Sequence, residues 1–242
     1  MTFPSEEAVE LAAHLTRRHK GTDSIAAVCR AALRTPYSVG LALASDAALA
    51  GRVSLCWDGP LADDGETLQV NLGEGPCVQA LQRHGPVHAD DLSLSPPTQA
   101  WPLFAHEARS RGIRAAFALP APFPATTGPG PGGVGGLVLS LYRDRPGPLS
   151  LADQHTATTH LSAALLLLRM TVAATPEDEH PSLIPLSQLH AVIHQASGMI
   201  SYRHGIPVDQ ALDRLRAHAL SHAVDLTDLA HAVVHEGRSI PE

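Results

Sequence analysis

The sequence predicts an α+β protein in two parts, a sheet domain flanked by helices and a small all-α domain behind it. Short apolar or alternating runs lie among helical segments up to about residue 172, whereas only helical periodicity is found from residue 186 onwards. An acidic segment punctuated by proline separates the two regions, as a linker does. With 242 residues, the chain is long enough for two modest domains.

The first part begins with helical periodicity over residues 5–34. A break is expected at HKGTDS, where the Thr, Asp or Ser side chain can cap a second helix. After residue 34 the helical spacing of apolar residues gives way to short strand-like runs. Two runs, 38–45 and 51–59, are apolar or alternating and end in Asp and Gly, as paired strands do. DDGETLQV is expected to add a turn and a further strand.

Glycine and proline mark the next elements. A glycine-rich turn precedes a short helix expected over 76–83, followed by an edge strand at Val87. TQAWPLFAHEARSRG is expected to be a helix that ends at Gly112, since glycine suits a left-handed cap. Two strands at 113–123 and 134–144 are joined by PATTGPGPGG, which is too rich in proline and glycine for regular structure and is expected to be a mobile loop.

A capped helix from Ser150 to Met170 closes the first part. Its apolar segment LSAALLLLRM is a candidate dimer seam, or it packs on the protein's own sheet. The predicted organisation is an N-terminal helix (1–21), a sheet domain (22–172), a linker (173–185) and a three-helix domain (186–238).

The second part reads as three short amphipathic helices. Gly205 ends the first helix and Pro207 opens the second, while Asp225 or Thr227 can cap the third. Helices of this length are not stable alone, so they are expected to share one core. The expected core residues are Leu186, Leu189, Val192, Ile193, Ala196, Met199, Ile200, Val208, Ala211, Leu212, Leu215, Ala219, Leu226, Leu229, Ala230, Val233 and Val234.

Composition excludes several classes of protein. The formal net charge of −7 gives no overall attraction to nucleic acid or anionic lipid, and no apolar run approaches a membrane span. The chain starts with acids before bases, the reverse of a signal peptide. We therefore expect a cytoplasmic protein with no membrane partner. Three cysteines, Cys29, Cys56 and Cys77, fit neither a disulfide framework nor a metal knuckle and are expected to be reduced.

The order of helices and strands in the first part, together with LGEGPCVQAL at 72–81, resembles a GAF domain. The resemblance implies a central antiparallel sheet with helices on its faces and the sensing of a small molecule. Glu74 and Cys77 are then candidate ligand-binding residues, since Cys77 follows a helix N-terminus that favours the thiolate. The alternatives are a solvated turn acid and a buried core cysteine. No ligand or cofactor can be named from the sequence.

Gly198 is expected in the middle of a helix, where glycine costs about 1 kcal/mol relative to alanine. At about 100° per residue, it projects away from the core stripe and lies near Gln195 and Tyr202. A small residue there lets another backbone approach closely, either a partner helix or a phosphate chain. The alternative is a glycine tolerated because the helix bends.

HQASGMISYRHGIPVDQALDRLRAHALSHAVDLTDLAHAVV, residues 194–234, resembles an ANTAR domain. The resemblance rests on alanine and glycine flanking one position, a glycine turn, ALxxLRxHA and a closing LxDLAxxVV. It implies a homodimer that binds paired RNA hairpins and relieves transcription termination when the sensor is engaged. Ser197 stands where many family members have lysine, and Val224 where a polar residue is common.

Residues 181–242 contain four arginines and six carboxylates, so their formal net charge is −2 and the domain as a whole is not basic. Any RNA-binding surface must therefore come from the basic side chains on one face of the helices. Arg216 is expected to pair with Asp213, three residues before it. Gln210, Arg214 and His218 lie at four-residue spacing and form a candidate donor ridge. The candidate RNA-binding residues are Gln195, Ser197, Gly198, Tyr202, Arg203, Gln210, Arg214 and His218, with a solvated surface as the alternative for each.

Three functional alternatives follow. Histidine pairs four residues apart can hold zinc, but no cysteine or carboxylate completes a tetrahedral set, so no metal is expected. A thiol (methionine sulfoxide) reductase centred on Cys77 needs resolving cysteines that are absent near it in sequence, so no enzyme is expected. The acidic sum favours the last alternative, a dimerisation module without RNA binding.

Overall fold

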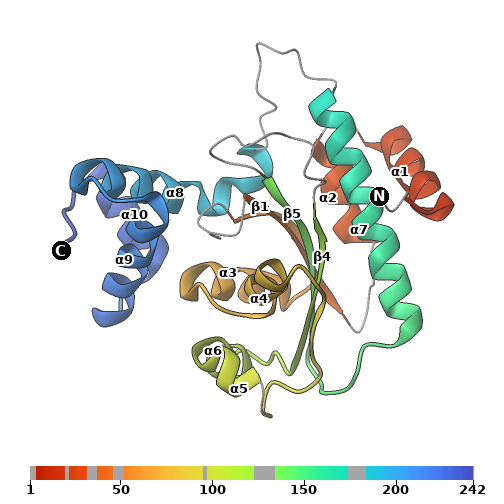
Figure 1. The fold of residues 1–242 in the computed structure, drawn as a ribbon, viewed down its shortest axis with the longest axis horizontal. Coiled ribbons are helices and arrows are strands. Elements are labelled where there is room, and N and C mark those ends of the chain that lie inside the picture. Colours follow the sequence, from red (N-terminus) through yellow and green to blue (C-terminus); the bar gives the residue numbers. More distant parts are fainter. Residues whose placement is uncertain are drawn as a thin grey trace.

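A computed structural model of the chain describes residues 4–19, 22–31, 37–45, 52–94, 97–122, 134–173 and 184–241. It has a five-stranded sheet between two layers of helices, followed by a three-helix bundle (Figure 1). The strands are β1 Ser38–Ser45, β2 Val53–Asp58, β3 Val87–Ala89, β4 Ala115–Pro122 and β5 Val134–Arg143. The helices are α1 Glu6–Arg18, α2 Thr22–Ala31, α3 Ala62–Leu72, α4 Pro76–Arg83, α5 Pro97–Ala100, α6 Pro102–Ser110, α7 Leu151–Ala173, α8 Ile184–His204, α9 Val208–Ser221 and α10 Leu226–His235.

The strand order is β2-β1-β5-β4-β3, and every neighbouring pair is antiparallel. The predicted α+β class and central antiparallel sheet are therefore confirmed. The strands at 38–45 and 51–59, the edge strand at Val87 and the two later strands all form where the sequence predicts them.

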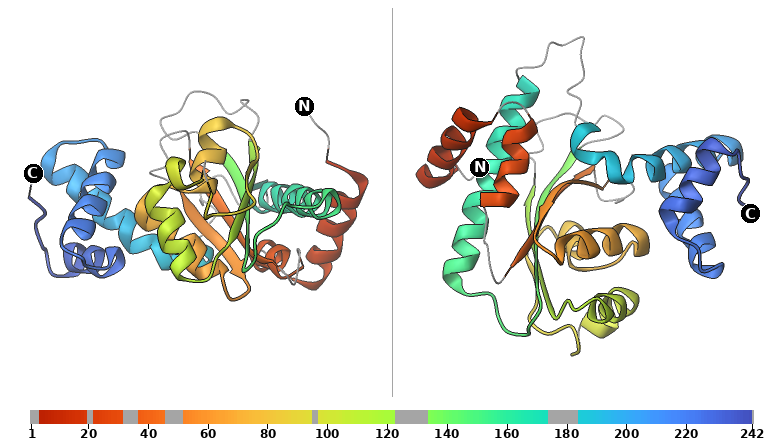
Figure 2. Two further views of the ribbon diagram at one scale, coloured as in Figure 1. Left: turned by 90° about the horizontal axis from the view of Figure 1, so that it is seen from below. Right: turned by 180° about the vertical axis from the view of Figure 1, so that it is seen from behind.

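The two faces of the sheet differ because side chains alternate along each strand. Odd-numbered positions such as Leu41, Phe117 and Leu139 are large and pack with α1, α2 and α7 in one core. Even-numbered positions meet α3, α4 and α6 in a second core; those of β1 and β4, such as Ala42 and Ala118, are small, whereas β5 contributes Val138 and Tyr142. Figures 1 and 2 show the two helical layers on opposite sides of the sheet. The small-residue face leaves room for the long side chains of α3.

The strand predicted over DDGETLQV is wrong, since these residues lie in helix α3. The helix buries Ala62, Gly65, Glu66 and Gln69, which follow helical spacing but include two polar residues and a glycine. Hydrophobic periodicity therefore does not show the helix, and the alternating TLQV imitates a strand.

The helix predicted over TQAWPLFAHEARSRG is divided into α5 and α6. Pro102 disfavours helical geometry in the residue before it, and Trp101 has an extended φ of −142°. Gly112 has a φ of 84°, as a residue that ends a helix in the left-handed region does.

Helix α7 packs on the protein's own sheet and on α1 and α2. Leu161, Ala164 and Leu168 are buried in the first core, and Leu165 is partly buried against it. Most of the candidate dimer seam is therefore covered within one chain.

None of the described helices is long and apolar enough to cross a membrane. The predicted mobile loop at 124–133 and most of the predicted linker lie outside the described residues.

Candidate functional site

The three C-terminal helices share one core, as predicted. Ile193 and Ile200 of α8, Leu212 and Leu215 of α9 and Val233 of α10 are buried together. The prediction is wrong for Val208, which is 45 % exposed at the start of α9. The side chains of Leu186 and Leu189 lie outside the described residues.

The ends of these helices follow the expected chemistry. Gly205 has a φ of 65°, which gives the left-handed turn between α8 and α9. The carboxylate of Asp225 accepts hydrogen bonds from the amides of Thr227 and Asp228 and so caps α10.

The bundle docks on the sheet domain through α8 and α9. His194 Nε2 lies 3.1 Å from the main-chain oxygen of Arg52, just before β2. Arg216 Nε donates to the main-chain oxygen of Val70 in α3 at 2.9 Å. Val70 itself is buried in the core of the bundle. Arg216 also pairs with Asp213, as predicted, but its side chain is only 17 % exposed because the sheet domain covers it.

The outer face of α8 is open to solvent. Gln195, Gly198 and Tyr202 are all exposed, and the Tyr202 ring is 91 % exposed. A Cβ atom on Gly198 would meet nothing within 4 Å. These residues line a shallow open depression that also includes Met199, Arg203, Val234 and His235. The structure thus places Gly198 outside the core stripe, in a hollow between α8 and α10.

Ser197 does not lie on this outer face. It is fully buried, and its hydroxyl donates to the main-chain oxygen of Ile193 at 2.8 Å. Four residues after Ile193 and three before Ile200, it belongs to the core side of α8. The prediction that Ser197 contacts RNA is therefore wrong, because its side chain is buried in the bundle.

The candidate donor ridge of Gln210, Arg214 and His218 lies along α9, and its side chains differ in their exposure to solvent. Gln210 is exposed, whereas Arg214 and His218 are partly buried. Arg214 Nη1 and His218 Nε2 are buried atoms that have no hydrogen-bond partner among the residues that the structure describes. The His218 ring stacks on His222 with centroids 4.0 Å apart. Burial and the charges of His222 and Arg238 lower the pKa of His218.

Glu74 has a structural role between the helices of the sheet domain. Its Oε1 accepts a hydrogen bond from the amide of Phe104 at 2.7 Å. That amide is in the first turn of α6, so Glu74 supplies the cap that Trp101 lacks.

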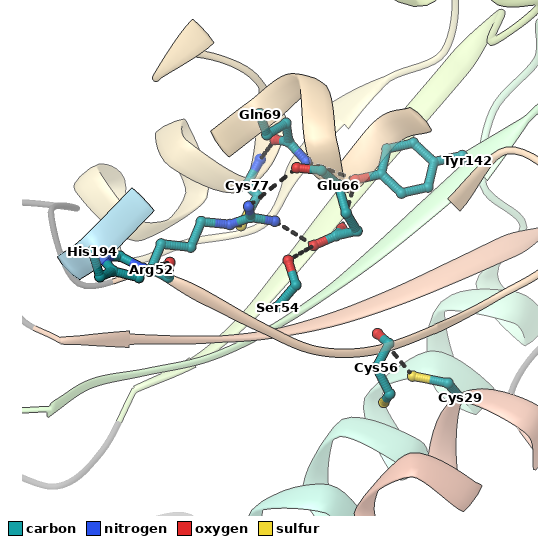
Figure 3. A network of polar contacts seen from close by, with 9 residues as sticks. All are labelled: Cys29, Arg52, Ser54, Cys56, Glu66, Gln69, Cys77, Tyr142 and His194. Atoms are coloured by element: carbon teal, nitrogen blue, oxygen red, sulfur yellow. Dashed lines mark hydrogen bonds and ion pairs between the residues drawn. The ribbon is translucent and has the colours of Figure 1, made fainter. Parts of the chain in front are cut away.

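Cys77 lies in a sealed environment. It is fully buried, and its sulfur accepts a hydrogen bond from Arg52 Nε at 3.2 Å. Burial raises the pKa of Cys77 although Arg52 opposes the change. The burial of Cys77 agrees with the alternative of a core cysteine. Cys29 and Cys56 lie in the core on the other face of the sheet (Figure 3).

Arg52 and Cys77 belong to a buried polar cluster beneath α3 (Figure 3). The Glu66 carboxylate forms an ion pair with Arg52 and accepts hydrogen bonds from Tyr142 at 2.7 Å and Ser54 at 3.0 Å. Each of these side chains is 4 % exposed or less. The carboxylate is thus compensated by one cation and two hydroxyl donors, as a buried charge requires.

Gln69 completes the cluster. Its Nε2 donates to Tyr142 Oη at 2.7 Å, and its Oε1 accepts from the amide of Cys77 at 2.7 Å. It therefore caps the start of α4. Two glycines leave the space that the cluster occupies. A Cβ on Gly40 would overlap the Glu66 carboxylate, and one on Gly65 would overlap the Tyr142 ring.

Local sequence patterns do not predict this cluster. Arg52, Glu66 and Gln69 give no signal in hydrophobic periodicity, and their partners are up to 76 residues away in the chain. Two weak signals were present, a charged residue before a strand and an acidic residue at a helical position facing a sheet.

Comparison with known protein families supports the predicted ANTAR resemblance of the C-terminal helices. The model of the ANTAR domain family matches residues 188–234, and no curated protein matches the chain. Among solved structures, SdiA from Escherichia coli is 11 % identical, with 95 % of this chain and 96 % of that chain covered and a TM-score of 0.48. A GAF domain of a phosphoenolpyruvate-protein phosphotransferase from Coxiella burnetii is 16 % identical, with 70 % and 99 % covered and a TM-score of 0.43.

Free methionine-R-sulfoxide reductase from Neisseria meningitidis is also 16 % identical, with 72 % of this chain and 98 % of that chain covered and a TM-score of 0.43. At such low identities and TM-scores, the assignment of the sheet domain rests on its own strand order and helical layers. Residues 188–234 are an ANTAR domain, and the sheet domain before them has the GAF-like arrangement of an antiparallel sheet between two helical layers.

Proposed function

We propose that this protein is a signal-responsive bacterial regulator that binds RNA hairpins through its ANTAR domain and thereby controls transcription termination. In this proposal the GAF-like sheet domain senses a small molecule or redox state, and the protein acts in the cytoplasm as a homodimer. The ANTAR match over 188–234 supports the RNA-binding part.

The observation that carries the proposal is the open outer face of α8. A tyrosine ring that is 91 % exposed stands beside a glycine hollow and the exposed Arg203. Unpaired RNA bases stack on aromatic rings, and arginine side chains neutralise phosphates. An exposed aromatic ring next to an arginine and a hollow that admits a backbone is suited to a hairpin loop.

The buried cluster around Glu66 supports a sensing role for the sheet domain. Arg52 belongs to the cluster through its side chain and contacts α8 through its main-chain oxygen. A ligand that rearranges the cluster would therefore act on the residue that meets the ANTAR domain. Ligand and RNA would then affect each other's binding reciprocally.

The test begins with RNA crosslinked to the full-length protein in its host and then sequenced. Binding of a recovered hairpin pair is measured by fluorescence anisotropy for the wild type, Tyr202→Ala and Arg17→Ala. Arg17 is an exposed arginine of α1, far from the ANTAR domain in sequence, and serves as the matched control. Loss of one stacking ring should weaken binding at least about fivefold.

The control should bind as the wild type does. Equal binding by Tyr202→Ala would contradict the placement of RNA on this face. A protein that dimerises in sedimentation experiments but binds no recovered hairpin would be an interaction module instead.

A further inference from the structure

The chain continues beyond the ANTAR match, and its C-terminal tail folds back onto the bundle. Gly237 has a φ of 70°, and the amide of Arg238 donates to the main-chain oxygen of Ala232 at 3.0 Å. Ile240 is 2 % exposed and lies in the core of the bundle. Residues 236–241 are therefore part of the folded domain, although the family match ends at residue 234.

The returning tail brings Arg238 into contact with the basic side chain of Arg203. Arg203 Nη1, at the end of α8, donates to the main-chain oxygen of Arg238 at 3.3 Å. The charge of Arg238 also acts on the ring of His218 in α9. Two elements that are separate in sequence, the end of α8 and the returning tail, thus place Arg203 and Arg238 in contact.

In the described part of the chain, no acid forms an ion pair with either Arg203 or Arg238, whereas Arg216 pairs with Asp213. Both Arg203 and Arg238 are exposed. The Arg203 guanidinium lies against the main chain of Arg238, so the two arginines are held side by side in the fold. An arginine pair without a counter-charge favours an anion, and the guanidinium fork matches a phosphate.

We propose that Arg238 and Arg203 together form a binding site for a backbone phosphate of RNA, and that the tail anchored by Ile240 is needed to build it. The site lies next to the hollow, because Arg203 also lines the depression at Gly198 and Tyr202. A strand whose loop base stacks on Tyr202 would then carry its phosphate to the arginine pair. This site rests on the proposed RNA-binding function and adds a contact that residues 188–234 do not contain.

The test uses full-length protein and the hairpin pair recovered from crosslinking. Binding is measured from about 50 to 200 mM salt for the wild type, Arg238→Ala, Arg238→Lys and the control Arg83→Ala, an exposed arginine of α4. Arg238→Ala should bind about tenfold more weakly and reduce the slope of log affinity against log salt by about one, since one phosphate contact is lost.

Arg238→Lys keeps the charge but not the fork, so it should retain the salt slope and lose part of the affinity. Ile240→Ala, which frees the tail without removing a charge, should weaken binding as Arg238→Ala does. If the wild type binds and Arg238→Ala binds equally with the same slope, the phosphate site is wrong and the proposed function stands. If the wild type binds no hairpin at all, the proposed function fails and this site fails with it.

Discussion

His194 in the ANTAR domain and Arg52 in the sheet domain are joined by a hydrogen bond of 3.1 Å between the His194 Nε2 atom and the Arg52 main-chain oxygen. A carbonyl oxygen only accepts, so Nε2 carries the hydrogen. The side chain of the same Arg52 is paired with Glu66 in the buried cluster. One residue therefore links the interior of the GAF-like domain to the first helix of the ANTAR domain.

The second contact between the domains predicts that Arg216→Ala loosens their docking. The substitution removes a 2.9 Å bond to the oxygen of Val70 and uncovers part of the interface. We expect a loss of about 1 to 3 kcal/mol in the free energy of unfolding, because a buried acceptor loses its donor. Hydrogen exchange should show faster exchange of the amides around Val70, measured together with urea unfolding.

Asp213→Ala is the matched control for the docking contact. It removes the ion-pair partner of Arg216, but Asp213 is 76 % exposed and the bond to Val70 stays. An exposed pair contributes about 0 to 1 kcal/mol, so a small change is expected. If Asp213→Ala were as destabilising as Arg216→Ala, the ion pair and not the contact between domains would hold Arg216.

The buried cluster predicts a large effect for Glu66→Gln. The substitution leaves the buried guanidinium of Arg52 without its counter-charge, which costs about 3 to 5 kcal/mol. Guanidinium unfolding of the full chain measures the change. Asp64→Asn, on the same helix and 49 % exposed, serves as the control and should change stability by less than about 1 kcal/mol. Similar effects of both substitutions would rule out a cluster held by the Glu66 charge.

The sheet could be predicted from the sequence because its strands alternate or are continuously apolar, and alternation is a local property. The helix at α3 could not, since its inward face includes Gly65, Glu66 and Gln69. Their burial is favourable only with partners such as Arg52 and Tyr142, which come from distant strands. When a polar residue is buried because its partners come from distant parts of the chain, the local sequence around it predicts a surface residue.

In the candidate site, too, some features could be predicted from the local sequence and others could not. The exposure of Gly198 and Tyr202 follows from helical geometry and could be predicted. The burial of Ser197 also follows from that geometry, four residues after Ile193, but the family resemblance assigned it to RNA instead. The contact of Arg216 with Val70 crosses 146 residues and depends on how the domains dock, which local patterns do not contain.

The buried environment of Cys77 predicts that its thiol reacts slowly with alkylating reagents. Burial raises its pKa, so the fraction of thiolate at neutral pH is small, and the side chain is fully buried. Native protein should therefore react with iodoacetamide at Cys77 far more slowly than protein unfolded in urea, as followed by mass spectrometry of the labelled peptide. Rapid labelling of Cys77 in the native protein would contradict this prediction and favour the thiol reductase alternative.

His218 predicts a loss of stability in mild acid. Burial and the charges of His222 and Arg238 hold its folded-state pKa below 6.5, so the unfolded chain takes up a proton more readily. Its contribution to stability is complete above pH 6.5 and is lost as pH falls from there through the folded-state pKa. Unfolding curves between pH 8 and about pH 5 measure this, and His218→Gln should flatten the dependence. An unchanged pH profile in His218→Gln would show that other groups cause it.

Gly198→Ala separates stability from function, because the added methyl group meets nothing within 4 Å in the free protein. Alanine is the better helix former by about 1 kcal/mol, so the melting temperature of the bundle should stay the same or rise. The methyl group would occupy the hollow beside Tyr202, so hairpin affinity should fall. Calorimetry and fluorescence anisotropy on the same preparation check both effects. Unchanged affinity would show that RNA does not approach α8 at this glycine, and a lower melting temperature would show that the glycine serves the helix itself.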